Sequence, residues 1–557
     1  MELFAAVTAL FTLVVAVAVT YRPLGDYMAW VFTNPRHGKV ESLIYRVCGV
    51  KPDKEQTWKG YLVVVLVFSA VGFLMLYGLQ RLQPMLPYSL GLGPISPDLA
   101  FNTAASYVGN TNWQAYSPEH TTGYAVQMAG LAVQSYVSAA VGFAVAIALV
   151  RGLTRSASTT VGNFWVDMLR INLRILLPLS ALATVVLIAA GVVQNFDGFT
   201  TVETLTGGTQ IIPGGPVASQ EAIKMLGTNG GGFYNANSAH PFENPSAWVN
   251  LFQTYMLIVI PFASIRTFGR LANDFRLARS LLATMAILLV VAYGTLTWFE
   301  LSGGGLAPQA AGAAMEGKEV RFGIIGSTLF TAATTGTTGG ATNSMLGSYT
   351  PLGQMVAILH MVLGEVSPGG VGSGLYTLLV LVVIAVFIAG LLVGRTPALL
   401  GKRITAREMK LAALVILVMP MLALGGMALS MAIPGVRAEI VANSMTDPDS
   451  QGMTELIYAF VSAAINNGSA MAGFAADTPW LNTILGVIIL LGRFLVIALV
   501  LAMAGSFARQ DRSTVMVADL PLHRPQFVVL LVGLIVFIAV PTFFPVLTVG
   551  PLAGGLR

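Results

Sequence analysis

The sequence predicts an all-α integral membrane protein with about ten transmembrane helices. Only 10% of its 557 residues are charged, whereas soluble domains carry about 25%, so the chain could not cover its surface in water. Apolar runs of about 20 residues, the length that crosses a bilayer as a helix, recur along the whole sequence. Glycine-rich loops of one kind recur four times between these runs. Cys48 is the only cysteine, which excludes disulfide frameworks and cysteine-based metal sites.

The apolar runs define ten predicted spans and an orientation. Most of the 30 Lys and Arg residues lie in the segments 22–59, 151–174, 266–279, 395–410 and 509–524. By the positive-inside rule these segments are cytoplasmic, and both chain termini are expected outside. The predicted spans are 2–21, 60–80, 124–150, 175–194, 250–269, 281–300, 351–394, 409–433, 480–506 and 526–547.

Four outer loops share a short amphipathic stretch followed by a turn rich in Gly, Asn and Thr. The amphipathic stretches are 98–107, 219–226, 323–334 and 455–464. Each loop lies between an inward and a returning span, so the four span–hairpin–span units are parallel and surround one axis along the membrane normal. The predicted divisions are an N-terminal span and cytoplasmic loop (1–59), repeats 60–155, 165–272, 277–400 and 405–508, and an additional C-terminal span (509–557).

The four turns have the chemistry of a filter for a dehydrated monovalent cation. They contain no Asp, Glu or Lys, so the ligands must be backbone carbonyls and neutral side-chain oxygens. A short helix ending at each turn directs its partly negative carbonyl end at the ion, and glycine allows positive φ. One such turn would be an ordinary loop, but four in register predict a filter. The candidate filter residues are Val108, Gly109, Asn110, Thr111, Asn112, Gly227, Thr228, Asn229, Gly230, Thr338, Gly339, Gly340, Ala341, Asn466, Asn467 and Gly468.

The seventh span, 351–394, is about twice too long for one transmembrane helix, at roughly 66 Å. Splitting it into two spans would place the basic segment 395–410 outside, against the charge rule. Its middle is rich in glycine, so we predict a break, which must be buried in protein or line a wet cavity. It is either a simple hinge or a gate on the ion path. The candidate gate residues are Gly364, Glu365, Gly369, Gly370 and Gly372.

One charge lies inside a predicted span. Arg493 is near the centre of 480–506, where an ionised side chain is costly and usually functional. Glu365 is its expected partner. The two side chains form either a structural ion pair or a device in which Arg493 blocks passive leak of cations.

Several motifs resemble the family of the A subunit of the bacterial Kdp potassium-transporting ATPase. The longest runs from Gly227 to Pro245, and the segments 110–114, 372–376, 394–397 and 466–469 are similar too. The resemblance covers essentially the whole chain. It implies a potassium-channel-like fold of the Trk/Ktr/HKT superfamily, with all four repeats in one chain. It also implies that Gln114 lies just beyond the first filter turn.

The resemblance implies partners as well. The chain would capture K⁺ from outside and pass it through an intramembrane tunnel to a P-type ATPase B subunit. A single-span C subunit and a small F subunit would complete the complex in the bacterial cytoplasmic (inner) membrane. The chain has no Asp-Lys-Thr-Gly phosphorylation motif and no Gly-x-x-x-x-Gly-Lys loop. We therefore expect it to bind no cofactor and to be a non-catalytic subunit, with ATP bound by its partner.

Two departures from the family pattern leave the K⁺/Rb⁺ selectivity open. The third turn has Ala341 after its two glycines, and Ile465 stands where another Asn is expected.

The sequence leaves two other functions open. A self-contained channel or symporter of the same architecture would need no ATPase partner. A secondary transporter for another solute would show inverted repeats, whereas the repeats here are parallel.

Overall fold

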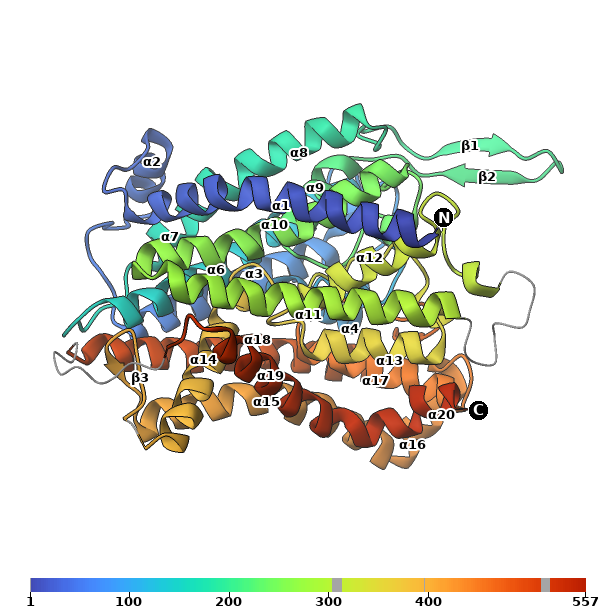
Figure 1. The fold of residues 1–557 in the computed structure, drawn as a ribbon. Helices are drawn as coiled ribbons and strands as arrows, with labels where there is room; N and C mark the ends of the chain where they lie inside the picture. Colours follow the sequence, from blue (N-terminus) through green and yellow to red (C-terminus); the bar gives the residue numbers. More distant parts are fainter. Residues whose placement is uncertain (1, 303–312, 395, 512–520, 557) are drawn as a thin grey trace.

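The computed structural model describes residues 2–302, 313–394, 396–511 and 521–556. Within these ranges, ten helices are long and apolar enough to cross a membrane, as many as the sequence predicts. They run side by side through one helical bundle (Figure 1). The start of α1 (Glu2–Thr33) and the end of α20 (Pro551–Gly555) lie at one end of the bundle, and α2 (Lys39–Val47) lies at the other.

The remaining elements have the following bounds. The other long helices are α3 (Trp58–Arg81), α6 (Val133–Thr154), α8 (Leu177–Ala189), α10 (Ala247–Ala272), α11 (Phe275–Ser302), α14 (Ser373–Leu392), α15 (Ala406–Ala432), α18 (Pro479–Arg509) and α19 (Pro525–Val549). A π-helical turn (Val126–Ala132) leads into α6, and α7 (Phe164–Arg170) continues through Ile171–Leu176 into α8. The shorter helices are α4 (Pro97–Val108), α5 (Pro118–Thr121), α9 (Val217–Leu226), α12 (Gly323–Gly336), α13 (Pro351–Val362), α16 (Pro434–Glu439) and α17 (Ser450–Ala464). Two antiparallel hairpins lie outside the bundle, β1 (Thr200–Glu203) with β2 (Thr209–Ile212) and β3 (Ala398–Leu399) with β4 (Lys402–Arg403).

Two spans extend further than the hydropathy indicates. Helix α1 continues beyond its predicted end, where Asp26 forms a salt bridge of 2.8 Å with Arg266 of α10. The fourth span begins with α7 rather than at residue 175, and Asp167 of α7 pairs with Arg151 of α6. Hydropathy marks only the apolar part of a helix, whereas paired charges allow it to continue past the membrane surface.

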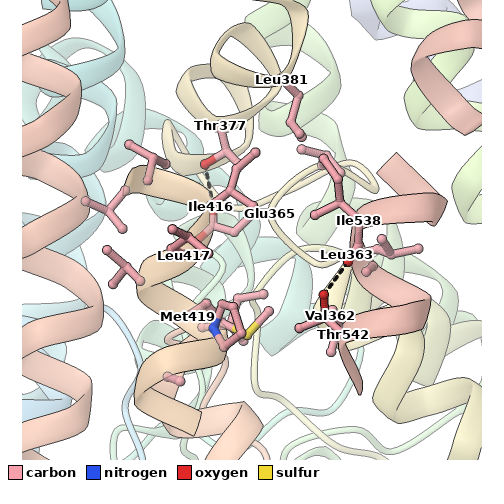
Figure 2. A pocket seen from close by; sticks show the side chains of 18 of the residues that line it. Val362, Leu363, Glu365, Thr377, Leu381, Ile416, Leu417, Met419, Ile538 and Thr542 are labelled. Atoms are coloured by element: carbon pink, nitrogen blue, oxygen red, sulfur yellow. Dashed lines mark hydrogen bonds between the residues drawn. The ribbon is translucent and has the colours of Figure 1, made fainter. Parts of the chain in front are cut away.

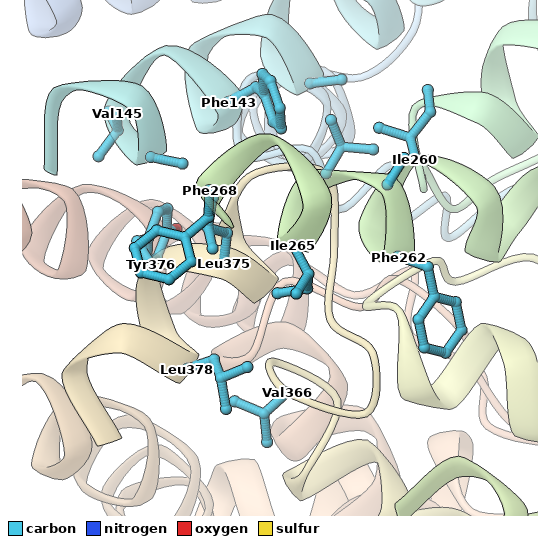
Figure 3. Packing of buried hydrophobic residues seen from close by; sticks show 14 of the residues in the cluster. Phe143, Val145, Ile260, Phe262, Ile265, Phe268, Val366, Leu375, Tyr376 and Leu378 are labelled. Atoms are coloured by element: carbon cyan, nitrogen blue, oxygen red, sulfur yellow. The ribbon is translucent and has the colours of Figure 1, made fainter. Parts of the chain in front are cut away.

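The core is centred on α6, α10 and α14. Small residues let other backbones approach α6 closely, because a Cβ on Gly142 would lie 2.8 Å from the carbonyl oxygen of Val371. Figure 3 shows aromatic side chains filling the space between these helices, Phe143 from α6, Phe268 from α10 and Tyr376 from α14. All three rings are buried. This packing holds the segment before α14 in place.

The seventh span is broken, as predicted. Helix α13 ends at Val362, a non-helical loop covers 363–372, and α14 begins at Ser373. At 12 residues, α13 alone is too short to cross a bilayer. The loop is enclosed by protein, and residues 366–372 are all buried. This burial is the condition under which irregular backbone is tolerated at membrane depth.

Candidate functional site

The short helices α4, α9, α12 and α17 all end at the predicted turns. Helix α4 starts with Pro97 at its first position, where the missing N–H of proline costs no hydrogen bond. After each helix the chain takes a left-handed backbone conformation, which L-residues rarely adopt. The φ angles lie between 49° and 66° at Asn110, Thr228, Thr338 and Asn466.

The four turns close with the same backbone hydrogen bond. One N–H in each turn donates to the carbonyl oxygen of the residue five positions earlier, in the preceding helix, always at 2.9 Å. This bond, together with the left-handed residue, is the Schellman pattern of helix termination. The donors are Thr111, Asn229, Gly339 and Asn467. Four different sequences therefore adopt one local geometry.

The four turns converge on one point. A Cβ on Gly230 would lie 3.1 Å from the carbonyl oxygen of Asn467 and 3.2 Å from Cα of Gly340. A Cβ on Gly340 would lie 2.6 Å from Cα of Gly230, and one on Gly468 would overlap the carbonyl oxygen of Thr111. The close approach of four backbones requires glycine at three of these positions. Carbonyl oxygens from the first and fourth turns lie at this point.

Asparagine side chains link neighbouring turns. The Asn110 amide donates to the carbonyl oxygen of Thr228 at 3.2 Å. The Asn466 amide donates to Thr111 Oγ1 at 3.0 Å, and the Asn467 amide donates to the carbonyl oxygen of Thr334 at 3.1 Å. The bond from Asn110 joins the first turn to the second. The two bonds from the fourth turn join it to the first turn and to the helix that precedes the third turn. The amide groups thus fix the relative positions of the turns.

A cavity of about 460 Å³ opens on one side of the turns. Its lining includes Gly231, Gly340 and Gly468 from the later part of three turns, and Gln114 beyond the first. Gln114 Oε1 accepts a hydrogen bond of 3.0 Å from the N–H of Gly232. The structure thus places Gln114 next to the turns, in the lining of this cavity.

The loop 363–372 closes the opposite side of the turns. The N–H of Gly369 donates to the carbonyl oxygen of Gly336 at 2.8 Å, where the third turn starts. The N–H of Val371 donates to Thr228 Oγ1 at 3.0 Å, at the start of the second turn. A Cβ on Gly370 would lie 3.1 Å from the carbonyl oxygen of Thr337. The candidate gate residues therefore contact the candidate filter residues on the side away from the 460 Å³ cavity.

A buried histidine holds this loop, which sequence reasoning missed. His360 of α13 lies with Nδ1 2.9 Å from Thr335 Oγ1 on α12. Its Nε2 lies 2.7 Å from Ser367 Oγ in the loop. The imidazole thus joins the third short helix to the loop. No motif marks it, because a lone His in an apolar run more often fills a core position.

Arg493 is buried, but the expected salt bridge with Glu365 is wrong. Its Nη2 donates to the carbonyl oxygen of Ser138 on α6 at 3.1 Å. In the part of the chain that the structure describes, no carboxylate oxygen lies within salt-bridge distance of this guanidinium. Glu365 instead accepts a hydrogen bond of 3.3 Å from Thr377 Oγ1. The guanidinium points toward α6, so the two charges interact only at longer range.

A second cavity, of about 190 Å³, lies beside the broken span (Figure 2). It is lined mainly by apolar side chains from α15, α18 and α19, with Glu365, Thr377 and Thr542 as polar members. Ile465 and Gly492 bring it to the start of the fourth turn. It therefore extends sideways from the end of the turns that faces the loop 363–372.

A buried charge network supports the second turn and was also missed. Lys224 of α9 pairs with Glu221 at 2.6 Å and with Glu243 at 2.8 Å. Glu243 Oε1 accepts hydrogen bonds from the N–H groups of Phe233 and Tyr234, each at 2.8 Å. The chain after Gly230 is thereby fixed from behind. The position of Lys224 within the amphipathic stretch 219–226 was the one signal in the sequence that this lysine could be buried and paired.

A family model described as "Potassium-transporting ATPase A subunit" matches residues 10–556. The chain belongs to this family. The resemblance that the motifs indicate is therefore confirmed.

Two candidate filter residues lie at the edges of the convergent turns. Val108 is the last residue of α4, and Ala341 follows the two glycines of the third turn.

Curated relatives in the A subunit family match the chain from end to end. The "Potassium-transporting ATPase potassium-binding subunit" of Clavibacter michiganensis subsp. michiganensis is 59% identical and covers 100% of both chains. The proteins of the same name from Cutibacterium acnes and Mycolicibacterium vanbaalenii are 54% and 51% identical, each over 98% of both chains.

A solved structure confirms the predicted fold class. The potassium transporter TrkH from Vibrio parahaemolyticus aligns with a TM-score of 0.51 at 15% identity. The alignment covers 88% of this chain and 98% of TrkH. This A subunit family member therefore has the all-α membrane fold of K⁺ transporters.

Proposed function

We propose that this chain is the potassium-binding, channel-like subunit of an ATP-driven K⁺ uptake complex. One observation carries the proposal. Four turns with one backbone geometry converge on a single point, without an acidic side chain among the filter residues. Backbone carbonyls arranged in this way replace the hydration shell of a monovalent cation. The names of the relatives identify that cation as K⁺.

K⁺ enters from an outer vestibule, the cavity of about 460 Å³, and is bound between the turns. The convergent backbones leave no room for side chains, and the carbonyl ends of α4, α9, α12 and α17 favour a cation there. The amide oxygens of Asn112 and Asn229 are buried without a hydrogen-bond donor in the described chain, which adds unneutralised negative potential near the turns.

The ion leaves the inner end of the turns sideways. The loop 363–372 blocks the direct path, since it is hydrogen-bonded to the second and third turns. The cavity beside Glu365 begins the tunnel toward the ATPase subunit. Arg493, next to this loop, repels cations that would continue straight into the cytoplasm.

The partners are a P-type ATPase B subunit, which binds and hydrolyses ATP, a single-span C subunit and a small F subunit. The complex lies in the bacterial cytoplasmic membrane. Both termini of this chain face outside, because α2 and the basic segments face the cytoplasm.

The gate is tested by shortening the loop. Deletion of Gly369 and Gly370 removes the bond to Gly336 and should produce passive K⁺ leak in liposomes that hold the complex without ATP. Deletion of Gly207 and Gly208, at the tip of the β1–β2 hairpin, is the control and should leave the liposomes tight. A leak-tight loop variant would show that the loop is not a gate.

The function is tested by K⁺-stimulated ATP hydrolysis in the complex that co-purifies with this chain in mild detergent. ATPase activity should rise with K⁺, and Gly230→Asp should abolish the stimulation because its side chain overlaps the other turns. The control Gly294→Ala lies where a Cβ meets open space and should behave as wild type. If no ATPase co-purifies and the chain alone passes K⁺, it is a self-contained channel-type transporter.

A further inference from the structure

A groove of about 850 Å³ lies at the end of the bundle that holds α2. It runs between the loop 48–57, the first turns of α3 and the start of α7. Its large apolar side chains are Val50, Val63, Val64 and Trp165. Val63 is 58% exposed, so the described part of the chain leaves this apolar surface uncovered.

The rim of the groove is positively charged. Lys51, Lys54 and Lys59 line it and are exposed, and none of them forms a salt bridge in the described parts of the chain. Glu55 in the same loop does not neutralise them, because its carboxylate is bound by Arg155 at 2.7 Å. The hydrogen bonds from Arg155 lower the pKa of Glu55, so this pair stays ionised. Asp53, an exposed carboxylate of the same loop outside the groove lining, offsets one of the three lysine charges. The groove therefore keeps a smaller local excess of positive charge.

The loop that carries two of these lysines is held rigidly. The side-chain amide of Asn163 donates to the carbonyl oxygens of Lys51 and Lys54, at 3.1 and 3.0 Å. The backbone N–H of Gln56 donates to the carbonyl oxygen of Gly162 at 2.7 Å. The rim is thus formed in advance of any ligand, which lowers the entropic cost of binding.

The neighbouring helix α2 places the groove at the membrane surface. Val40, Leu43 and Val47 are exposed on one face of this helix, while Glu41 and Tyr45 on another face are buried against the bundle. A short helix with an uncovered apolar face beside a membrane bundle lies in the interface between headgroups and acyl chains. The groove begins where α2 ends, at Cys48.

We propose that this groove binds one anionic phospholipid of the cytoplasmic leaflet. The three lysines receive the phosphate headgroup, and an acyl chain lies along Val63, Val64 and Trp165. A free anion would use the lysines but leave the apolar surface exposed. A zwitterionic lipid would fill the apolar surface but match the charge less well. Basic pockets at this side of membrane bundles bind acidic headgroups for the same reason.

The test is native mass spectrometry of the intact complex, titrated with phosphatidylglycerol in mild detergent. The variant Lys51→Gln/Lys54→Gln/Lys59→Gln should retain the lipid about a hundredfold more weakly than wild type. The control Arg403→Gln/Arg407→Gln/Lys410→Gln removes three exposed charges elsewhere at the cytoplasmic side and should retain it as wild type does. Phosphatidylethanolamine with the same acyl chains should be retained weakly by all three proteins. The lysines of the groove form no ion pairs with any residue that the structure describes, so the three single substitutions provide the same comparison if the triple variant unfolds.

Several results would overturn the proposal. Equal losses in the groove variant and in the control would mean that only overall surface charge matters. Displacement of the lipid by inorganic phosphate at similar concentrations would mean that the lysines bind phosphate alone. Retention by the isolated full chain but not by the complex would mean that another subunit occupies the groove.

Discussion

At the scale of single residues, the site depends on backbone positions more than on side-chain chemistry. Gly230, Gly340 and Gly468 allow four turns to approach within van der Waals contact. The turn motifs and their glycines could be predicted from the sequence because their composition is unusual. The roles of the asparagine amides could not, since a side chain that braces a neighbouring turn acts across more than 100 residues of sequence, as Asn110 does toward Thr228.

Thr228 provides a prediction at this scale. Its hydroxyl oxygen accepts the hydrogen bond from the N–H of Val371 and so attaches the gate loop to the second turn. Thr228→Val keeps the shape but leaves a buried N–H unpaired, which costs about 1–3 kcal/mol. We expect passive K⁺ leak through liposomes to rise about tenfold or more. Thr228→Ser retains the oxygen and should leak as wild type does; equal leak in the two variants would mean that this bond does not hold the gate.

At the scale of elements, the spans and the four short helices follow from hydropathy and turn chemistry. The break between α13 and α14 was also predictable, because its glycines and its excess length conflict with a single helix. What the loop contacts was not predictable. The loop is fixed by His360, Gly336 and Thr228, which come from three different parts of the chain. The salt bridge expected between Arg493 and Glu365 is wrong for a similar reason. The direction of the Arg493 side chain depends on its packing against α6, which the sequence does not reveal.

The ion network at α9 is expected to stabilise the second repeat. Lys224→Met leaves Glu221 and Glu243 buried without a cation, so the free energy of unfolding should fall by about 3–5 kcal/mol. Lower melting temperature of the complex in detergent would report this loss. The exposed Lys410→Met serves as the control. Lys224→Met with Glu243→Gln should recover part of the stability; a single variant as stable as the control would mean that the network is not stabilising.

At the scale of the whole molecule, the described elements gather at two opposite ends of the bundle. The start of α1, the end of α20 and the β1–β2 hairpin lie at one end of the bundle, opposite α2 and β3 (Figure 1). The count of spans and their parallel repetition were predictable, because both depend on long, strongly apolar segments. The exact ends of α1 and the fourth span were not, because interhelical ion pairs such as Asp26–Arg266 extend them.

Cys48 allows the orientation to be measured directly. It is exposed beside α2 and is the only cysteine in the sequence. A membrane-impermeant maleimide should not label it in intact spheroplasts and should label it after permeabilisation. In the variant Cys48→Ser/Leu205→Cys the new thiol lies on the outer hairpin and should be labelled in intact spheroplasts. The reverse pattern would place both termini in the cytoplasm.

The most direct test of the central claim is the position of the bound ion. Crystals of the complex grown with Rb⁺ or Tl⁺ in place of K⁺ should give an anomalous difference peak between the turns, within reach of the carbonyl oxygens of Thr111 and Asn467. The account predicts that this peak disappears in Gly230→Asp. A strong peak elsewhere in the chain, with none between the four turns, would contradict the assignment of these turns as the K⁺ filter.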